Sequence, residues 1–406
     1  MKIAVCTIGS RGDIQPFLVL GHALTLRGHE VRLATAEMYA SLAERYDVDF
    51  MPFEGDYAAL VDSNEMKKAV GGNPFSIGKR LKEKVYPLIE NSLDTFFDAA
   101  AWADVVVYHP KTLIDTFGKL YSQKLIKAYV IPAFTPTTAF PSPIFSSFRI
   151  PKFLNKATFK LTHALISTVK GPIRSFCSKQ NLRARFTLLD TPVLYGISRH
   201  FLALPHDYPA NHHFTGFWFD DSSSELPEKI KTFFSTNRKK LIITFGSMPY
   251  KCKTDINDLI SAIQFKLDVV VCVVRGWGLK EAPIAETDDV LAVDEASFNR
   301  LFPLADAVVH HGGAGTTAIA LRSGRPMMIC PVLHPVGDQM FWGRKAVQVG
   351  LGVSPITLSK LTVSRFVSSV TELLTTDYSD SSRRMQENLA SEDGLETAAA
   401  IIESQA

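Results

Sequence analysis

Residues 2–12, KIAVCTIGSRG, decide the fold. The first seven of them form a compact apolar run rich in β-branched side chains, which is typical of a strand buried on both faces. After the glycine-rich turn, apolar residues recur at helical spacing up to Gly28, a typical helix C-cap. A second strand is expected at residues 31–35. The order of strand, glycine turn, helix and strand predicts a doubly wound, Rossmann-like α/β domain.

The same alternation continues outward from this start. The polar, acidic segment 220–227, DDSSSELP, is the best candidate linker. We therefore predict an N-terminal acceptor-binding domain (1–219) and a C-terminal nucleotide-sugar-binding domain (220–406), whose last helix packs back on the first domain. Two domains suit a chain of 406 residues. Further strands are expected at residues 48–52, 104–109, 128–132, 241–245, 269–274, 290–293, 307–310 and 327–331.

The composition excludes several classes of protein. Apolar residues make up 46% and charged residues 21%, which are ordinary globular values and exclude fibrous or wholly disordered chains. Five scattered cysteines without a CxxC pair favour neither a disulfide scaffold nor a zinc ribbon. Apolar runs are far shorter than the ~20 residues of a membrane span, and residues 1–10 suggest a strand rather than a signal peptide. We expect a cytoplasmic protein.

The charge is distributed unevenly along the chain. Residues 116–189 contain twelve Lys or Arg and no Asp or Glu, so a net charge of +3 leaves −9 for the rest. Aromatic residues such as Phe148 and Phe153 are interleaved with these cations. The segment could be a solvated basic face, a contact for anionic lipid headgroups or a channel for an anionic substrate. Nucleic acid is not an expected partner, because no recognised binding motif accompanies the segment.

The strongest local motif is residues 307–318, AVVHHGGAGTTA. Its glycines let the backbone approach a ligand, and the start of the following helix offers unpaired N–H groups and a positive dipole end. This combination suits a phosphate or diphosphate, and a neighbouring histidine could donate a hydrogen bond to it. A tight turn without a ligand is the alternative. The GxGxxG pattern and the Walker lysine are missing from this turn, which disfavours an NAD-binding protein and a P-loop NTPase.

A second motif, residues 331–343, PVLHPVGDQMFWG, places Asp338 and Gln339 after the end of a predicted buried strand. Doubly wound folds place ligand contacts there. A carboxylate and an amide side by side could hydrogen-bond several sugar hydroxyls. The alternative is a loop that caps the next helix.

Four blocks together carry a resemblance to a known family: residues 9–16 (GSRGDIQP), 244–249 (TFGSMP), 301–317 (LFPLADAVVHHGGAGTT) and 337–343 (GDQMFWG). They resemble the family 1 glycosyltransferases with the GT-B fold, in the branch of sterol glucosyltransferase-like and antibiotic (vancomycin-type) enzymes. The resemblance implies two Rossmann-like domains facing a central cleft. It also implies an inverting, metal-independent hexosyltransferase without a cofactor, which moves glucose from UDP-glucose, or another sugar from a UDP- or TDP-sugar.

The resemblance also implies roles for individual residues. His310 matches the family histidine at the diphosphate, and Asp338 and Gln339 match the pair that holds the sugar. The other residues expected on the donor side are Gly9, Ser10, Arg11, Gly246, Ser247, Arg275, Trp277, Ser297, Phe298, His311, Gly313, Ala314, Gly315 and Thr316.

An inverting transfer needs one general base to deprotonate the acceptor hydroxyl, with water excluded. The antibiotic branch places an aspartate after the first strand, so Asp13 is the candidate base. Alternatively, Asp13 only caps a helix that starts at Ile14. His109 and Asp115, which follow the strand at 104–109, could orient or replace it.

The expected acceptor is a hydroxyl of a lipophilic small molecule such as a sterol, polyketide, phenol or lipid. Candidate contacts are Phe53, Phe75, Phe134, Phe140 and Phe145, although each could simply be core. Two other functions stay open, a UDP-sugar epimerase and a non-catalytic nucleotide-sugar-binding protein. We also expect the basic segment 116–189 to bring the acceptor side to an anionic membrane surface, which would make the protein peripheral on the membrane.

Overall fold

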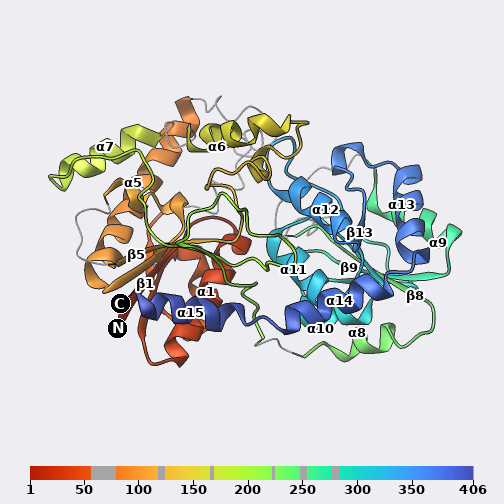
Figure 1. Ribbon diagram of the computed structural model, residues 1–406. Helices are drawn as coiled ribbons and strands as arrows, with labels where there is room; N and C mark the ends of the chain where they lie inside the picture. Colours follow the sequence, from red (N-terminus) through yellow and green to blue (C-terminus); the bar gives the residue numbers. More distant parts are fainter. Residues whose placement is uncertain are drawn as a thin grey trace.

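The computed structural model describes residues 1–55, 79–117, 124–164, 169–221, 225–246, 254–276 and 283–405. These residues form two α/β halves that lie side by side (Figure 1). Each half contains a parallel sheet with its own helices.

The first sheet has seven parallel strands in the order β3-β2-β1-β4-β5-β6-β7. Strand β1 lies in the interior of this sheet, between β2 and β4, and four of its five residues are buried. The strands are β1 (Lys2–Cys6), β2 (Glu30–Ala36), β3 (Asp49–Phe53), β4 (Val105–Tyr108), β5 (Lys124–Tyr129), β6 (Val193–Tyr195) and β7 (His212–Phe214).

Helix α1 (Arg11–Leu26) follows β1 directly and packs against β2. Its apolar residues Phe17, Leu18 and Leu24 are fully buried, as the helical spacing predicts. The helix begins at Arg11 with Ser10 as N-cap, three residues earlier than expected. The other helices described in this half are α2 (Ala40–Glu44), α5 (Lys79–Trp102), α6 (Asn155–Ala164) and α7 (Lys170–Lys179), with short 3-10 turns η1 (Glu37–Tyr39), η2 (Pro110–Thr112), η3 (Ile114–Thr116), η5 (Pro143–Phe145) and η6 (Lys152–Leu154).

The second sheet has six parallel strands in the order β10-β9-β8-β11-β12-β13. All six residues of β9, VVVCVV, are buried, as expected for a parallel strand covered on both faces. The strands are β8 (Lys239–Thr244), β9 (Val269–Val274), β10 (Val290–Val293), β11 (Ala307–His310), β12 (Met327–Ile329) and β13 (Gly352–Val353). The helices are α8 (Glu228–Phe233), α9 (Ile256–Lys266), α10 (Phe298–Leu301), α11 (Ala314–Arg322), α12 (Gln339–Gln348), α13 (Val363–Thr375), α14 (Ser379–Ala390) and α15 (Gly394–Ser404), with 3-10 turns η8 (Phe302–Leu304) and η9 (Leu358–Lys360).

The two halves share an apolar core. The ring of Phe201 stacks on Trp342 with 5.7 Å between centroids, and Phe140 lies 5.3 Å from Phe341. Both contacts belong to one buried cluster that contains residues of both sheets. The N–H of Gly337 also donates to the Ile144 carbonyl, with 2.8 Å between the atoms. Packing therefore sets the position of helix α12 relative to the first half.

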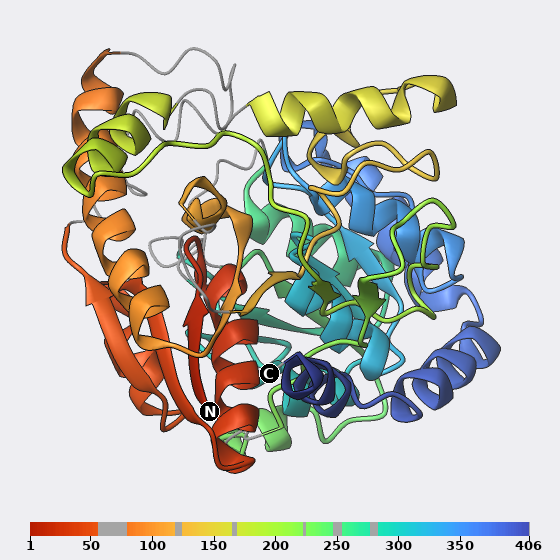
Figure 2. The same ribbon diagram turned by 60° about the vertical axis from the view of Figure 1, so that its left-hand side comes forward.

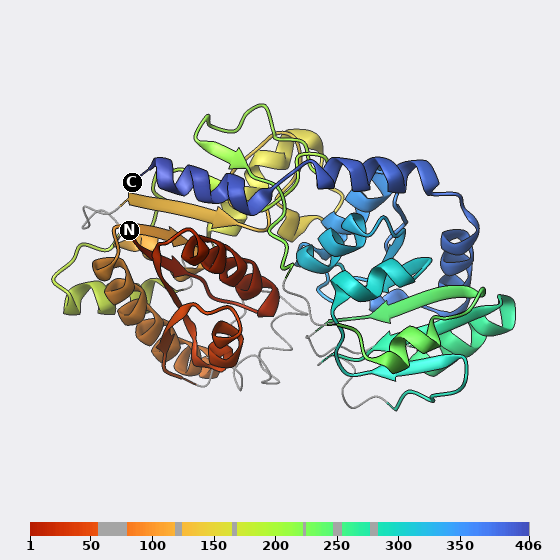
Figure 3. The same cartoon turned by 90° about the horizontal axis from the view of Figure 1, so that it is seen from below.

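Two further connections join the halves. Asp220, in the predicted linker, accepts from Tyr46 through its carboxylate, and its carbonyl accepts from Asn299. The last helix, α15, crosses back to the first half and lies beside α1 (Figure 3). There Arg27 pairs with Glu396 at 2.7 Å and with Glu403 at 2.6 Å. The chain termini consequently lie close together (Figure 1).

Candidate active site

The glycine-rich motif forms an open turn between β11 and α11. Gly312 has a φ of +90°, a backbone conformation that favours glycine, and Gly313 is the N-cap of α11. Among the described residues, no side chain caps this helix end, and no heavy atom lies within 4 Å of a Cβ placed on Gly315. The first-turn N–H groups, from Ala314 to Thr316, therefore surround a space that suits an anion.

His310, expected to contact the diphosphate, does not point into this space. Its side chain is fully buried. Its Nδ1 accepts the Gly312 N–H at 3.1 Å, and its Nε2 lies 3.4 Å from the sulfur of Met327. With both ring nitrogens engaged inside the protein, His310 holds the turn in shape, and the expectation of a ligand contact is not consistent with this position.

His311, and not His310, lies beside the glycine-rich turn that is expected to bind the diphosphate. Its ring lies between Gly246, at the end of β8, and Gly313; a Cβ on either glycine would come within 2.6 Å of the ring. The Nδ1 atom has no hydrogen-bond partner among the described residues. Burial lowers the pKa of His311 to about 4, so the ring is neutral at pH 7 and offers one N–H donor. His311 is thus the histidine suited to a phosphate oxygen.

The two histidines should respond differently to truncation. We expect His310→Ala to lower the free energy of unfolding by about 2–4 kcal/mol, because it empties a buried site. His311→Ala should leave stability nearly unchanged and lower sugar transfer by about 10²- to 10³-fold, as for loss of an oxyanion donor. Urea denaturation and initial rates would measure both. The reverse pattern would return the ligand role to His310.

Asp338 and Gln339 begin helix α12 and differ in role. The Asp338 carboxylate accepts from the Trp342 indole N–H at 2.7 Å. The Gln339 side-chain oxygen accepts from the N–H groups of Val332 and Leu333, at 2.7 and 2.8 Å. Gln339 therefore holds the preceding loop. Burial raises the pKa of Asp338 to about 6, so its charge responds to mild acid.

Asp13 belongs to the first half, and its charge acts on Asp338 of the second half. Its carboxylate accepts the Ser10 N–H at 2.9 Å and pairs with the Lys111 ammonium at 2.6 Å. Asp13 is the third residue of α1, so it helps to cap that helix without starting one at Ile14. A Cβ on Gly9 would lie 2.3 Å from the Asp13 carboxylate. Only glycine at position 9 leaves room for this arrangement.

The charges of Asp13 and Lys111 act on Asp338 across the boundary between the halves. Besides burial and the Trp342 bond, Asp13 raises and Lys111 lowers the pKa of Asp338. Burial by itself would raise the pKa of Asp13, but the Lys111 charge, the neighbouring His109 and hydrogen bonds hold it below its usual range. Asp13 is thus an ionised carboxylate whose charge acts on Asp338 of the second half. Lys111 is not among the site residues predicted from the sequence, although its position after a strand end, close to His109, was the available signal.

Removal of Lys111 should be visible in the pH dependence of activity. The ion pair lowers the pKa of Asp13, and a base must be deprotonated to act, so activity should fall as the pH drops through that pKa. We expect Lys111→Met to raise the pKa and move the acid limb of kcat/KM to higher pH. Lys111→Arg, which keeps the charge, should leave the limb in place. An unmoved limb in Lys111→Met would mean that Asp13 does not titrate in that limb.

His109 and Asp115, the other acid–base candidates, lie deeper. The His109 ring packs edge-on against Phe134 with 5.4 Å between centroids, and its Nδ1 accepts the Lys111 N–H at 3.1 Å. Burial lowers the pKa of His109 to about 3. Asp115 is buried and pairs with Lys127 at 3.2 Å. His109 can therefore pack beside Asp13 and help to orient it, whereas Asp115 is part of a structural ion pair. The expectation that Asp115 replaces the base is not supported.

Of the remaining donor-side candidates, Arg275, Ser297 and Phe298 follow strands of the second sheet, whereas Arg11 begins helix α1 of the first half. Arg275 follows β9 and pairs with Asp294 at 3.1 Å. Ser297 is the N-cap of α10, and Phe298 stacks on Phe302 with 4.7 Å between centroids. Arg11 is exposed and donates to Gln15 at 3.3 Å. Three predicted residues lie outside the described residues: Phe75, Ser247 and Trp277.

The predicted acceptor aromatics that the structure describes differ in burial: Phe134 is partly exposed and the others are buried. Phe53 is 1% exposed and packs on Phe96, and Phe140 and Phe145 are also buried. Their expected role in acceptor binding is thus not supported, because neighbouring side chains cover them. Phe134 is half-buried, stacks on Tyr129 and contacts His109. Of the described candidates, Phe134 is the one that lies beside the Asp13 region.

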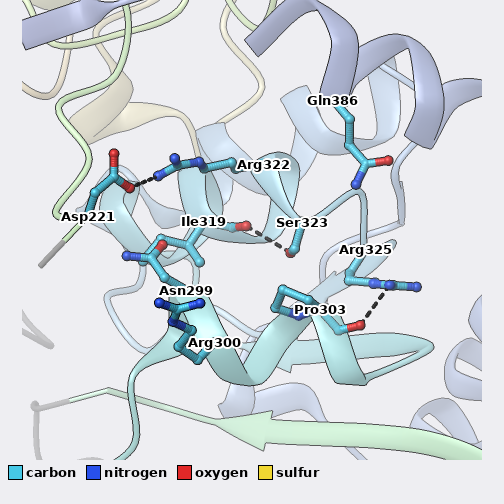
Figure 4. Close-up of a pocket in the computed structure, with 9 residues that line it drawn as sticks. All are labelled: Asp221, Asn299, Arg300, Pro303, Ile319, Arg322, Ser323, Arg325 and Gln386. Atoms are coloured by element: carbon cyan, nitrogen blue, oxygen red, sulfur yellow. Dashed lines mark hydrogen bonds and ion pairs between the residues drawn. The ribbon is translucent and has the colours of Figure 1, made fainter. Parts of the chain in front are cut away.

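A cavity of about 350 Å³ lies elsewhere, at the opposite end of α11 from Gly313 (Figure 4). Its lining includes Arg300, Arg322 and Arg325, and Arg322 is paired with Asp221 at 2.5 Å. None of the residues expected to bind the donor lines it. This cavity is therefore separate from the candidate site.

Comparison with protein families gives a match on each half. Residues 3–114 match the glycosyltransferase family 28 N-terminal domain, and residues 262–403 match the erythromycin biosynthesis protein CIII-like, C-terminal domain. The two matched ranges contain Asp13 and Lys111 in the first half, and His311 and Asp338 in the second.

Similar proteins extend over nearly the whole chain. A sterol 3-beta-glucosyltransferase of Arabidopsis thaliana is 29% identical over 98% of this chain and 67% of its own length. The O-mycaminosyltylonolide 6-deoxyallosyltransferase of Streptomyces fradiae is 28% identical over 99% of this chain and 97% of its own. Several fungal sterol 3-beta-glucosyltransferases also match, but the chain spans only 26–30% of their length.

The crystal structure of the calicheamicin glycosyltransferase CalG4 is similar over the whole of this chain and over 98% of the CalG4 chain, with a TM-score of 0.72 and 15% sequence identity. The fold and the matches on both halves thus define a GT-B glycosyltransferase. Within this class, the chain is similar to sterol and antibiotic glycosyltransferases. The resemblance predicted from the four motifs is confirmed, with family 28 instead of family 1 as the N-terminal match.

Proposed function

We propose that the protein transfers a sugar, with inversion and without metal, from a UDP- or TDP-sugar to a hydroxyl of a lipophilic small molecule. One observation carries the proposal: the charge of the Asp13 carboxylate in the first half raises the pKa of Asp338 in the second half, which also carries the glycine-rich turn. A base and an anion site on opposite sides of a boundary are what an in-line displacement needs.

The donor would bind mainly to the second half. The first-turn N–H groups of α11 would hold the diphosphate, and the neutral His311 would donate to one of its oxygens. Asp338 would accept hydrogen bonds from sugar hydroxyls, with Gln339 holding the loop beside it. We propose glucose as the sugar, because the Arabidopsis relative is a glucosyltransferase; the name of the Streptomyces relative points instead to a deoxysugar.

In the transfer step, Asp13 would accept the proton of the acceptor hydroxyl while the oxygen of that hydroxyl attacks the anomeric carbon of the sugar. The bond to the nucleoside diphosphate breaks from the opposite face, and the leaving diphosphate takes the bonding electron pair. The α11 N–H groups and His311 stabilise that negative charge. Lys111 keeps Asp13 ionised and oriented before the acceptor arrives.

The acceptor would lie against the first half, beside the half-buried Phe134. The Phe134 ring packs on the buried rings of Tyr129 and His109, and the three form an apolar wall next to Asp13. An apolar wall with one carboxylate suits a hydroxyl on a lipophilic skeleton. The relatives' names refer to a sterol and to the macrolide tylonolide, and we propose an acceptor of that class.

Mass spectrometry of products from a crossed panel would test the function. The panel pairs UDP-glucose, UDP-GlcNAc, TDP-glucose and a TDP-deoxysugar with sterols, macrolide aglycones and phenols. We expect glycoside product only where donor and acceptor are both present. Conversion of the sugar nucleotide without acceptor would indicate an epimerase. Nucleotide affinity without product on any acceptor would indicate a binding protein.

A further inference from the structure

Helix α6 is amphipathic in the reverse of the usual sense. Its buried face carries Asn155, Thr158 and Thr162 around Phe159. The two threonines are hydrogen-bonded inside the protein, since the Ser142 N–H donates to Thr158 Oγ1 at 2.7 Å and Thr162 Oγ1 lies 2.9 Å from the Ser142 hydroxyl. The helix is therefore held by Phe159 and by these hydrogen bonds, whereas Ala157 and Leu161 are left facing outward.

The solvent-exposed side of α6 carries an apolar stripe that continues into the preceding turn η6. Phe153 is 84% exposed, Leu161 49% and Leu154 41%. Phe153, Ala157 and Leu161 recur every four residues, which places them on one stripe of a helix. A water-exposed stripe of this kind is unfavourable unless something covers it.

Cations flank the stripe at the same spacing. Lys152, Lys156 and Lys160 precede Phe153, Ala157 and Leu161 by one residue each, and all three are exposed. Lys156 pairs with Asp207 at 3.1 Å. Within the described part of the chain, Lys152 and Lys160 have no ion pair. Helix α6 itself lies at the outer edge of the molecule (Figure 2).

We infer that η6 and α6 (residues 152–164) form a docking surface for an anionic phospholipid membrane. Charge complementarity selects this occupant: three lysines would contact lipid phosphates while Phe153, Leu154 and Leu161 enter the acyl boundary. An apolar ring beside a lysine row suits such an interface, in which lysine stems extend along apolar surface. No helix of the described residues is long and apolar enough to cross a bilayer.

The docking surface is connected to the candidate acceptor wall. His163 of α6 makes a 2.8 Å hydrogen bond through its Nε2 to the carbonyl of Phe134, whose ring contacts His109. A docked α6 would thus bring the acceptor side toward lipid. The membrane contact does not depend on the proposed function; its use in collecting a lipophilic acceptor does.

Vesicle co-sedimentation of the full chain would test the inference, with phosphatidylcholine vesicles alone or mixed with phosphatidylglycerol, at low and high salt. We expect binding to the mixed vesicles that weakens in high salt. Phe153→Ser should weaken it by about 10- to 100-fold. Phe265→Ser, on α9, is the matched control, because Phe265 is also a highly exposed phenylalanine, at 95%. Lys152→Glu with Lys160→Glu should weaken binding by about 30-fold or more, unlike Lys229→Glu with Lys266→Glu.

Two further readouts separate the alternatives. Transfer to a water-soluble acceptor should be unchanged in Phe153→Ser, whereas transfer to an acceptor dissolved in mixed vesicles should fall with binding. Equal vesicle binding by the Phe153 and Phe265 variants, or binding indifferent to lipid charge, would overturn the inference. So would light scattering that shows a dimer dissociated by Phe153→Ser without vesicle binding, since a second copy would then cover the stripe.

Discussion

Asp13→Asn is expected to lower the rate of sugar transfer by about 10²- to 10⁴-fold, the usual range for loss of a general base. The substitution keeps the side-chain volume and the acceptor atom for the Ser10 N–H, so helix α1 should remain capped. Nucleotide affinity should be nearly unchanged, because the proposed diphosphate contacts lie on α11 and His311. Initial rates and calorimetric titration with UDP and TDP would measure the two effects.

A matched control for this variant is Asp98→Asn, which removes an exposed carboxylate from helix α5. It should leave both rate and affinity as they are. Full activity in Asp13→Asn would remove Asp13 as base and return attention to His109. A parallel loss of nucleotide affinity would instead make Asp13 a donor contact.

Asp338→Asn is expected to weaken binding of the sugar nucleotide by about 10- to 100-fold while leaving UDP and TDP affinity nearly unchanged. The estimate follows from losing hydrogen bonds to a charged acceptor, worth about 1.5–3 kcal/mol. Asparagine still accepts from the Trp342 N–H, so α12 should keep its position. Equal weakening of nucleotide and sugar nucleotide would contradict a sugar contact.

The same residue gives a pH signature. Because burial raises the pKa of Asp338 to about 6, the carboxyl is protonated below that pH and loses acceptor capacity. Sugar-nucleotide affinity of the unmodified protein should therefore decline as the pH falls through about 6. In Asp338→Asn this decline should be absent. A titration of affinity between pH 5 and pH 8 would show whether the two curves differ.

The fold was largely predictable because its central strands are unusually pure. Runs such as VVVCVV in β9 have no polar residue and are bounded by breakers, so their burial on both faces could be inferred. Strand β5 was misplaced, since Lys124 and Lys127 belong to it. Lys127 is buried by pairing with Asp115, a distant partner that a local pattern does not reveal. Strands β6, β7 and β13 were missed because two or three residues carry no periodicity.

The site was predictable at the level of motifs but not of individual side chains. The HHGG motif marked the glycine-rich turn that we propose as the anion site, yet only the three-dimensional structure distinguishes a buried His310 from a His311 placed between two glycines. Asp13 could be proposed from its position, whereas its partner Lys111 is 98 residues away in the sequence. The aromatic acceptor candidates looked equivalent in sequence, and tertiary packing separated Phe134 from the core.

Inverting transfer with Asp13 as base is tested by proton NMR of the product formed from an α-linked UDP- or TDP-sugar and an accepted lipophilic alcohol. We expect a β-glycoside that forms only when donor and acceptor are both present and that is lost in Asp13→Asn. An α-glycoside, or turnover of the donor that is independent of any acceptor, would contradict it.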